Sequence, residues 1–289
     1  RTLMKNRELE ITSETLPMEA YAALREIPGI ETIAYLATHN LQIMLNTKVP
    51  PTDDIHIRKA LSWVMDYDVV VNDIWPNYVQ SVGPVPQTLP GHGKDTFQYS
   101  YNLEKAKEEM AKSAYAGQEN IPFKLSWCAE VPDEEKVALL FQVNAAEIGI
   151  DVEILKNPFG VMIDDAQTVG TTPNGSVVYV AAHYNEAGSM LETRYHSKSQ
   201  GTWEQCEWLG SPEIDAAIEG ALATVDQGER FKKYTEIQHT LVDLVPTIWL
   251  ADDAMQFAYP KAYLTWPIAE QIKAGKPIST TIEYIDCAL

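Results

Sequence analysis

The sequence predicts an α/β fold with parallel strands, because a strand, a helix and a second strand follow one another within roughly 30 residues. Residues 123–127 alternate as a strand, and Asp133 begins a helix with one apolar face. Gly149 ends that helix, and residues 150–154 alternate again. A further run, 177–182, is apolar on both faces, which is typical of a central strand covered by helices on both sides.

The first part of the chain predicts a helix, a long extended segment and a second helix. Residues 18–25 have helical spacing, and residues 31–46 alternate well enough for a strand. Asp53 or Asp54 is placed to cap the helix that follows. Proline and glycine are frequent over residues 76–101, so we expect an irregular loop there.

The remaining elements are predicted from their caps and apolar stripes. Asn102 begins a helix that reaches about residue 114, and Ser211-Pro212-Glu213 is a strong helix start. A second helix is expected over about 229–244, followed by a short strand at 247–250. From Pro260 onward the chain is expected to be irregular.

The charge of the chain excludes several classes of protein. The 289 residues carry 22 Lys and Arg against 41 Asp and Glu, a formal net charge of −19. Such an acidic surface repels phosphate backbones and anionic lipid headgroups, so nucleic-acid partners are not expected. No run of the sequence approaches the ~20 apolar residues that would insert into a bilayer.

The cysteines and histidines predict neither a metal site nor a cofactor. Cys128, Cys206 and Cys287 form no C-x-x-C pair, and their number allows at most one disulfide. The six histidines make no i,i+4 pair and no H-E-x-x-H motif. No phosphate-binding glycine loop or nucleophile elbow is present either.

Paired acids leave an enzymatic alternative open. Asp164-Asp165 and Asp252-Asp253 could supply the two carboxylates of a glycoside hydrolase. Neighbouring residues on a strand or helix point apart, however, so sequence neighbours make poor catalytic pairs. A solvated surface position is the favoured interpretation for both pairs.

Aromatic and polar residues after strands are the better candidates for a binding site. Trp127 stands at the end of one predicted strand, and Trp203 lies in a predicted loop together with Trp208, Tyr184 and Tyr195. Residues 182–187 follow the predicted central strand, where ligands bind in open α/β sheets. For any single aromatic residue, packing of a loop onto the core remains the more frequent role.

Six motifs resemble those of bacterial extracellular solute-binding proteins of the oligopeptide, dipeptide and nickel class (family 5). Residues 46–61 match N-x-x-x-P-P-x-x-D-x-x-V-R-x-A-L with Ile57 in place of valine. The other five follow in family order over nearly the whole chain. They are D-R-D-like 66–68, G-P-x-P at 83–86, Y-N-P-E-K-A-K-like 101–107, L-G-I-D-V-like 148–152 and N-P-E-F-D-like 211–215.

The resemblance implies a type II-like periplasmic-binding-protein fold, with a mixed sheet flanked by helices. It places residues 32–255 in a distal lobe, with 1–31 and 256–289 as segments of the proximal lobe. It also implies a longer natural protein, with lipid anchoring through a preceding segment as one option. The expected role is the substrate-binding component of an ABC importer, without catalysis, in the periplasm or outside the cell. Its expected partners are a small solute and the membrane permease of that transporter.

The resemblance also marks the ligand loop. Residues 182–187 are similar to the A-D-Y-N-E-P of oligopeptide binders, but His183 stands where the family has an acid that pairs with the peptide ammonium. An imidazole cannot replace that carboxylate, so an oligosaccharide-like ligand is weighed beside a peptide. A sensor or scaffold relative without transport is a further alternative. The predicted ligand-binding residues are Trp127, His183, Tyr184, Asn185, Glu186 and Trp203.

Overall fold

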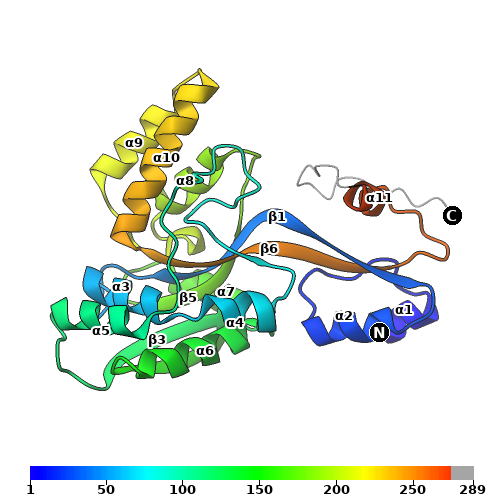
Figure 1. The fold of residues 1–289 in the computed structure, drawn as a ribbon, viewed down its shortest axis with the longest axis horizontal. Coiled ribbons are helices and arrows are strands. Elements are labelled where there is room, and N and C mark those ends of the chain that lie inside the picture. Colours follow the sequence, from blue (N-terminus) through cyan, green and yellow to red (C-terminus); the bar gives the residue numbers. More distant parts are fainter. Residues whose placement is uncertain (275–289) are drawn as a thin grey trace.

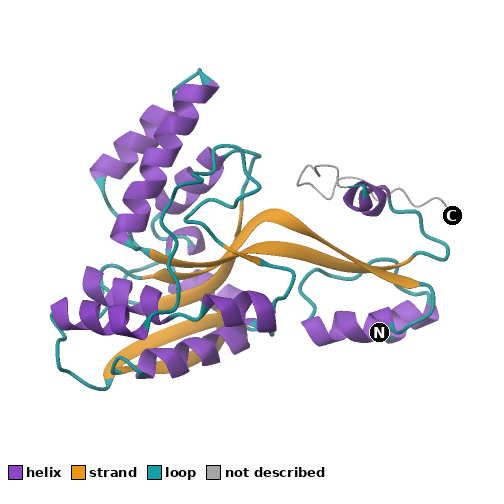
Figure 2. Cartoon of the chain, in the orientation of Figure 1, coloured by secondary structure: helices purple, strands orange, loops and turns teal. Residues whose placement is uncertain are grey.

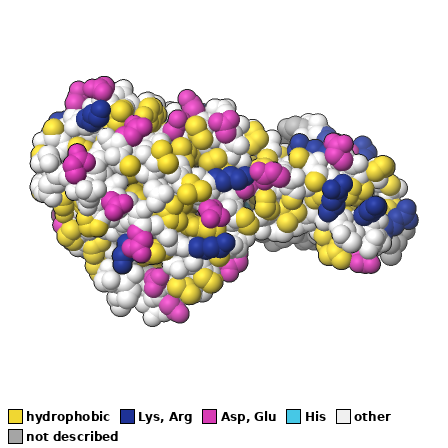
Figure 3. Space-filling view, turned by 90° about the horizontal axis from the view of Figure 1, so that it is seen from below, with side chains coloured by type: hydrophobic (Ala, Val, Ile, Leu, Met, Phe, Trp, Pro, Cys, Tyr) yellow, Lys and Arg dark blue, Asp and Glu magenta, His cyan; other side chains and the backbone are white. Residues whose placement is uncertain are grey.

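A continuous pair of antiparallel strands joins a larger and a smaller body in the computed structural model (Figure 1). The structure describes residues 1–274, so the predicted segment beyond them, including Cys287, lies outside the described residues. The two joining strands are β1 (Ile30–Leu45) and β6 (Thr247–Pro260). The smaller body projects from the larger one, as Figure 3 shows from below.

The sheet is mixed, with the strand order β2-β6-β1-β5-β3-β4. β3 pairs in parallel with both β4 and β5, whereas β1 runs antiparallel to β5 and β6. The predicted parallel strands and the interior position of β5 are therefore confirmed. The remaining strands are β2 (Val79–Gln80), β3 (Ile121–Cys128), β4 (Ile150–Asn157) and β5 (Gly175–Ala181).

Helices cover both faces of the sheet in the larger body (Figures 1 and 2). The helices before β5 are α1 (Thr2–Asn6), α2 (Met18–Arg25), α3 (Ile55–Val64), α4 (Tyr67–Val69), the π-helix η1 (Val70–Ile74), α5 (Leu103–Lys112), α6 (Glu134–Ala146) and α7 (Phe159–Asp165). Those after β5 are α8 (Ala187–Tyr195), the 3-10 turns η2 (Ser197–Ser199) and η3 (Trp203–Gln205), α9 (Pro212–Leu222), α10 (Gln227–Leu244) and α11 (Pro267–Lys273).

The larger body has one hydrophobic core on each face of the sheet. Ile43 and Val177 face the core beneath α3, α5 and α6, whereas their neighbours Met44 and Val178 face the core beneath α8, α9 and α10. This alternation follows from the two-residue period of a strand. Both faces are therefore closed by apolar packing, which leaves the sheet edges and loops for a binding site.

Most helix starts form as the sequence predicts. The side chains of Asp54, Asn102 and Ser211 each accept a hydrogen bond from a backbone N–H of the first turn of α3, α5 and α9. Gly149 precedes β4 with a φ of +80°, a conformation that costs glycine little. Local chemistry thus sets these boundaries.

Three predictions about the chain were wrong. β6 continues to Pro260, ten residues beyond the predicted end of the strand at residue 250, because its pairing with β1 extends to Ile30 opposite Pro260. α11 begins at Pro267 in the segment expected to be irregular, with proline in its first turn. Tyr195 belongs to the buried helix α8, not to a loop.

The smaller body is built on the far ends of β1 and β6. Tyr21 and Leu24 of α2 pack on Ala258 of β6 in one small core, and Phe257 packs edge-on against Trp266 beside α11 in another. The two bodies therefore have separate cores and share one pair of strands.

Within residues 1–274 no helix is both long and apolar enough to cross a bilayer.

Candidate functional site

A cavity of about 260 Å³ lies where the smaller body meets the larger one. The smaller body contributes the segment before α2. The larger body contributes the strands β1, β5 and β6, the region around η1 and β2, the loop before α6 and the turn η3. The lining residues are Glu14, Thr15, Leu16, His39, Trp75, Tyr78, Val131, Asp133, Tyr179, Ala181, Trp203 and Asp253.

An irregularity in the sheet brings two of these residues to the cavity. The pairing of β1 with β6 breaks between Leu36, opposite Ala254, and Asn40, opposite Asp252. Three residues of β1 therefore oppose the single residue Asp253, and His39 is one of the three. Such bulges bend a strand and change the direction of its side chains, often beside functional sites.

The bulge is held by hydrogen bonds from other elements. The Thr88 hydroxyl donates to the carbonyl of Ala37 at 2.6 Å, and the N–H of Ala182 donates to the carbonyl of Thr38 at 3.1 Å. These bonds replace part of the β1–β6 backbone pairing that is missing at the bulge, since buried carbonyl groups need hydrogen-bond partners. The positions of His39 and Asp253 are therefore fixed by the loop after β2 and by the end of β5.

The two acids Asp252 and Asp253 have different environments, and the expected surface position was wrong for this pair. Both are buried, with exposed fractions of 0% and 6%. Asp252 accepts from the Ser81 hydroxyl at 2.7 Å and from the N–H of Gln87 at 2.8 Å. Burial nevertheless raises the pKa of Asp252 to about 6. Adjacent strand residues point apart, so they do not form a catalytic pair.

Asp253 is a buried acid of the cavity wall with an incomplete set of hydrogen bonds. Its Oδ2 lies 3.4 Å from Nδ1 of His39. Among residues 1–274, no donor reaches its Oδ1. A buried carboxylate normally has hydrogen bonds or an opposite charge, because desolvation of the charged form is costly. This wall of the cavity therefore has unused capacity to accept hydrogen bonds.

Three aromatic rings line the cavity together with this acid. Trp75 stacks on Tyr78 with a ring separation of 5.3 Å, and Tyr179 meets Trp75 edge-on at 6.2 Å. The hydroxyls of Tyr78 and Tyr179 are 3.0 Å apart. Burial and then the charge of Asp253 raise the pKa of Tyr78 well above its usual value, so its phenol stays neutral.

A set of polar contacts joins the smaller body to α6 beside the cavity. Asp133 precedes α6 but does not cap it, contrary to the prediction. Its Oδ2 accepts from the N–H of Met18 at 3.1 Å, at the start of α2. Lys136 bridges Asp133 at 2.9 Å and Glu19 at 2.7 Å. Asp133 thus caps a helix of the other body.

The predicted ligand residues occupy different places. Trp203 lines the cavity and packs edge-on against Phe159 at 5.2 Å. His183 is exposed and pairs with Glu204, next to Trp203, at 2.8 Å. Tyr184 and Asn185 are also exposed but do not line the cavity. Their contribution to ligand binding stays a prediction.

Trp127 and Glu186 have partners within the larger body. Trp127 is 1% exposed in the core beneath α6, with the Lys156 ammonium 5.0 Å from its ring centre. Glu186 pairs with the guanidinium of Arg230 at 2.8 Å and accepts from the Tyr234 hydroxyl at 2.9 Å. Their predicted ligand role stays untested, but these contacts place both in structural packing.

Sequence reasoning missed Asp253, His39 and the aromatic pair Trp75 and Tyr78. Asp253 was interpreted as a surface acid, and Trp75 precedes a loop rich in proline. Their proximity depends on the bulge in β1 and on the pairing of β6 with β2, which are long-range contacts. The one available signal was the pair of acids within an otherwise apolar strand-like run.

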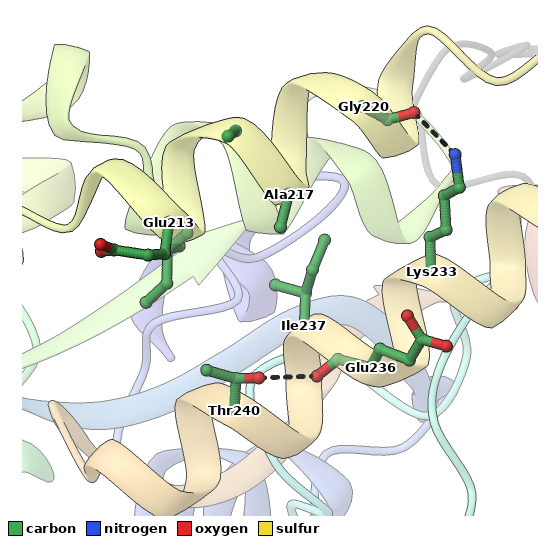
Figure 4. Close-up of a pocket in the computed structure, with 9 residues that line it drawn as sticks. Glu213, Ala217, Gly220, Lys233, Glu236, Ile237 and Thr240 are labelled. Carbon is green, nitrogen blue, oxygen red and sulfur yellow. Dashed lines mark hydrogen bonds between the residues drawn. The ribbon is translucent and has the colours of Figure 1, made fainter.

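A second cavity, of about 450 Å³, lies in the groove between α9 and α10 (Figure 4). Two of its polar side chains bond to the backbone of these helices: Lys233 donates to the carbonyl of Gly220 at 3.3 Å, and Thr240 donates to that of Glu236 at 3.0 Å. Ile237 and Ala217 form its apolar floor. No polar groups converge there as they do at Asp253, so the smaller cavity is the better candidate.

Within the described residues, no group of three or more His, Cys, Asp or Glu is placed to hold a metal ion. Cys128 and Cys206 are buried and not bonded to each other. Burial raises the pKa of each thiol to about 12, which keeps both in the unreactive protonated form.

The fold is that of the type II periplasmic binding proteins. The chain superimposes on DppA of Helicobacter pylori, solved in complex with the peptide STSA, with a TM-score of 0.82 at 19% identity, covering 90% of this chain and 50% of that one. A dipeptide-binding protein from Pseudoalteromonas sp. SM9913, in complex with Met-Leu, gives a TM-score of 0.80 at 17% identity, covering 90% and 51%.

The sequence defines the family more closely. Residues 1–202 match the model of bacterial extracellular solute-binding proteins, family 5, middle region, and the chain belongs to that family. The protein named "Probable D,D-dipeptide-binding periplasmic protein DdpA" of Escherichia coli K12 is 25% identical over 273 residues, 90% of this chain and 50% of that protein. The periplasmic oligopeptide-binding protein OppA of the same organism is 24% identical, covering 82% and 44%. The chain thus spans about half the length of the curated relatives it matches.

Proposed function

We propose that this chain forms one wall of the solute site of an ABC-importer binding protein. The observation that carries the proposal is the cavity between the two bodies, lined by Glu14–Leu16 from one side and by β5, β6 and aromatic side chains from the other. Ligand pockets occur preferentially between such bodies and combine apolar walls with a few polar groups. The family, which consists of solute-binding proteins rather than enzymes, supports the same role.

In this proposal residues 32–255 are the distal lobe, and 1–31 and 256–289 belong to the proximal lobe. The bulge at His39 and Asp253 lies in the only pair of strands that crosses between the two bodies within residues 1–274. Because regular pairing is interrupted there, it is the natural hinge. A solute that contacts both bodies favours the closed arrangement by its differential affinity.

The closed protein would deliver its solute to the membrane permease of the transporter, in the periplasm or outside the cell. Curated relatives carry periplasmic names, which supports this location. No observation favours the glycoside hydrolase, since Asp252 is engaged by Ser81 and Gln87 and faces away from Asp253. A sensor or scaffold without transport has no specific observation in its favour either.

The proposal is tested by filling the cavity. Ala181 lines it and is partly buried, so Ala181→Trp would place an indole where the solute is expected. The matched control is Ala217→Trp in the groove between α9 and α10. Native mass spectrometry of the complete polypeptide that contains this chain would detect retained solute. We expect wild type and Ala217→Trp to retain it and Ala181→Trp to lose it; equal retention by both variants would refute the assignment.

A further inference from the structure

We propose that Asp253 binds a positively charged nitrogen group of the solute, with the rings of Trp75 and Tyr78 beside it. The inference rests on the proposed function, because it assigns a ligand class to the same cavity. It is carried by an acid with an exposed fraction of 6% in the cavity wall whose Oδ1 has no donor among residues 1–274.

The charges around the cavity favour a cation. Of its lining side chains, Glu14, Asp133 and Asp253 are acids, and His39 is the one basic group among them. Lys136 and the N–H of Met18 already engage Asp133. Glu14, on the cavity wall that the smaller body contributes, is exposed to solvent. The cavity is therefore negative, and Asp253 is its buried acid without a close cationic partner.

His39 does not complete the hydrogen bonding of the Asp253 carboxylate. The separation of 3.4 Å between Nδ1 and Oδ2 exceeds the 2.7–3.2 Å range of good N–H···O bonds. It also concerns only one of the two oxygens. A ligand ammonium or guanidinium has several donors and would supply the missing hydrogen bonds together with the opposite charge.

The aromatic neighbours suit the same group. A cation is attracted to the faces of tryptophan and tyrosine rings, and this attraction strengthens when water is excluded. Trp75, Tyr78 and Tyr179 all line the cavity with Asp253. Because the phenols of Tyr78 and Tyr179 are neutral, they add no competing negative charge.

Asp253 lies at the proposed hinge, so a cation bound there could influence how the two bodies close. Asp253 faces the three-residue bulge of β1, and the segment Glu14–Leu16 of the smaller body lies across the same cavity. A cation held at Asp253 would therefore stand at the point where the bodies meet. Its binding energy would favour the closed arrangement only if it contacts both sides.

The test compares Asp253→Asn with Asp252→Asn in the complete polypeptide. The control removes a neighbouring buried acid that binds Ser81 and Gln87 and does not line the cavity. The probes are two matched pairs, trialanine with N-acetyl-trialanine and cadaverine with N,N′-diacetylcadaverine, together with any solute that wild type retains. Affinity is measured by calorimetry, and retained solute is identified by native mass spectrometry.

We expect wild type to retain a solute with a charged nitrogen, or to bind an amine at least about tenfold more tightly than its acetylated partner. Asp253→Asn should abolish this preference, and Asp252→Asn should keep it. Asp253→Asn should also melt at or above the wild-type temperature, because it removes a buried charge without a close partner. If it unfolds instead, Asp253→Ser serves as the second variant.

Three results would overturn the inference: a retained solute that is neutral or anionic, an amine preference that survives in Asp253→Asn, or no binding of any amine-bearing molecule. Retention of a neutral solute would leave the proposed function standing. Failure of the polypeptide to retain or bind any solute would refute the proposed function as well.

Discussion

The contact between α2 and Asp133 allows one prediction to be worked out in detail. α2 begins after Pro17 and has no side-chain cap of its own, so the carboxylate of Asp133 supplies the acceptor for the N–H of Met18. The side chain of Asp133 is 5% exposed, and Lys136 holds it on the other side at 2.9 Å. Asp133→Ala would remove both interactions.

The expected loss follows from these two contacts. A helix cap contributes about 1 kcal/mol, and a half-exposed ion pair adds at most about 1 kcal/mol. We expect α2 to lose about 2 kcal/mol of local stability, which is roughly a 30-fold fall in the protection of its amides, since 1.36 kcal/mol is a factor of ten. Asp133→Asn keeps an oxygen for Met18 and should lose less.

Hydrogen exchange followed by mass spectrometry measures this effect over Met18–Arg25. The matched control is Glu135→Ala, which removes an exposed acid from the same first turn of α6. Protection in Asp133→Ala within threefold of wild type, or an equal loss in Glu135→Ala, would show that Asp133 does not hold the smaller body.

The other predictions concern stability and binding in the larger body. Burial raises the pKa of Asp252 to about 6, so this one group destabilises the folded state by about 2 kcal/mol as the pH rises from 4 to 6. In urea unfolding, the free energy of unfolding of Asp252→Asn should fall by about 2 kcal/mol less than that of wild type over this range, and equal slopes would contradict the burial of the charge. Trp127→Ala should lower the free energy of unfolding by about 3–5 kcal/mol in urea, because Trp127 is buried in the core. Trp203→Ala should mainly weaken solute binding measured by calorimetry, because Trp203 lines the cavity. The reverse pattern would contradict the positions of the two residues. Arg194→Met leaves the buried Glu207 without its ion-pair partner and should lower the free energy of unfolding by about 3–5 kcal/mol. The added change Glu207→Gln should recover most of this loss in thermal unfolding. If Arg194→Met alone is as stable as wild type, the pair contributes little.

Elements with strong local signals could be predicted from the sequence. The caps at Asp54, Asn102 and Ser211 and the left-handed glycine Gly149 set boundaries that tertiary packing did not alter. The parallel pairing of β3 with β4 followed from the helix between them, since a parallel connection needs a crossover of that length.

What failed depended on contacts between distant segments. Two adjacent acids are typical of a surface turn, yet Asp252 is buried by Ser81 and Gln87. Asp253 is buried by the bulge of β1, more than 200 residues earlier in the chain. Neither partner is visible from the local sequence, so β6 was predicted too short and its cavity-lining acid was missed.

Hydrogen exchange with and without the retained solute tests the central claim most directly, namely that the cavity between the two bodies is the solute site. The complete polypeptide would be stripped of its solute by reversible unfolding and then resupplied with it. We predict new protection around Glu14–Leu16, around His39 in β1 and around Asp253 in β6. Protection confined to the groove between α9 and α10, or no change at His39 and Asp253, would contradict the claim.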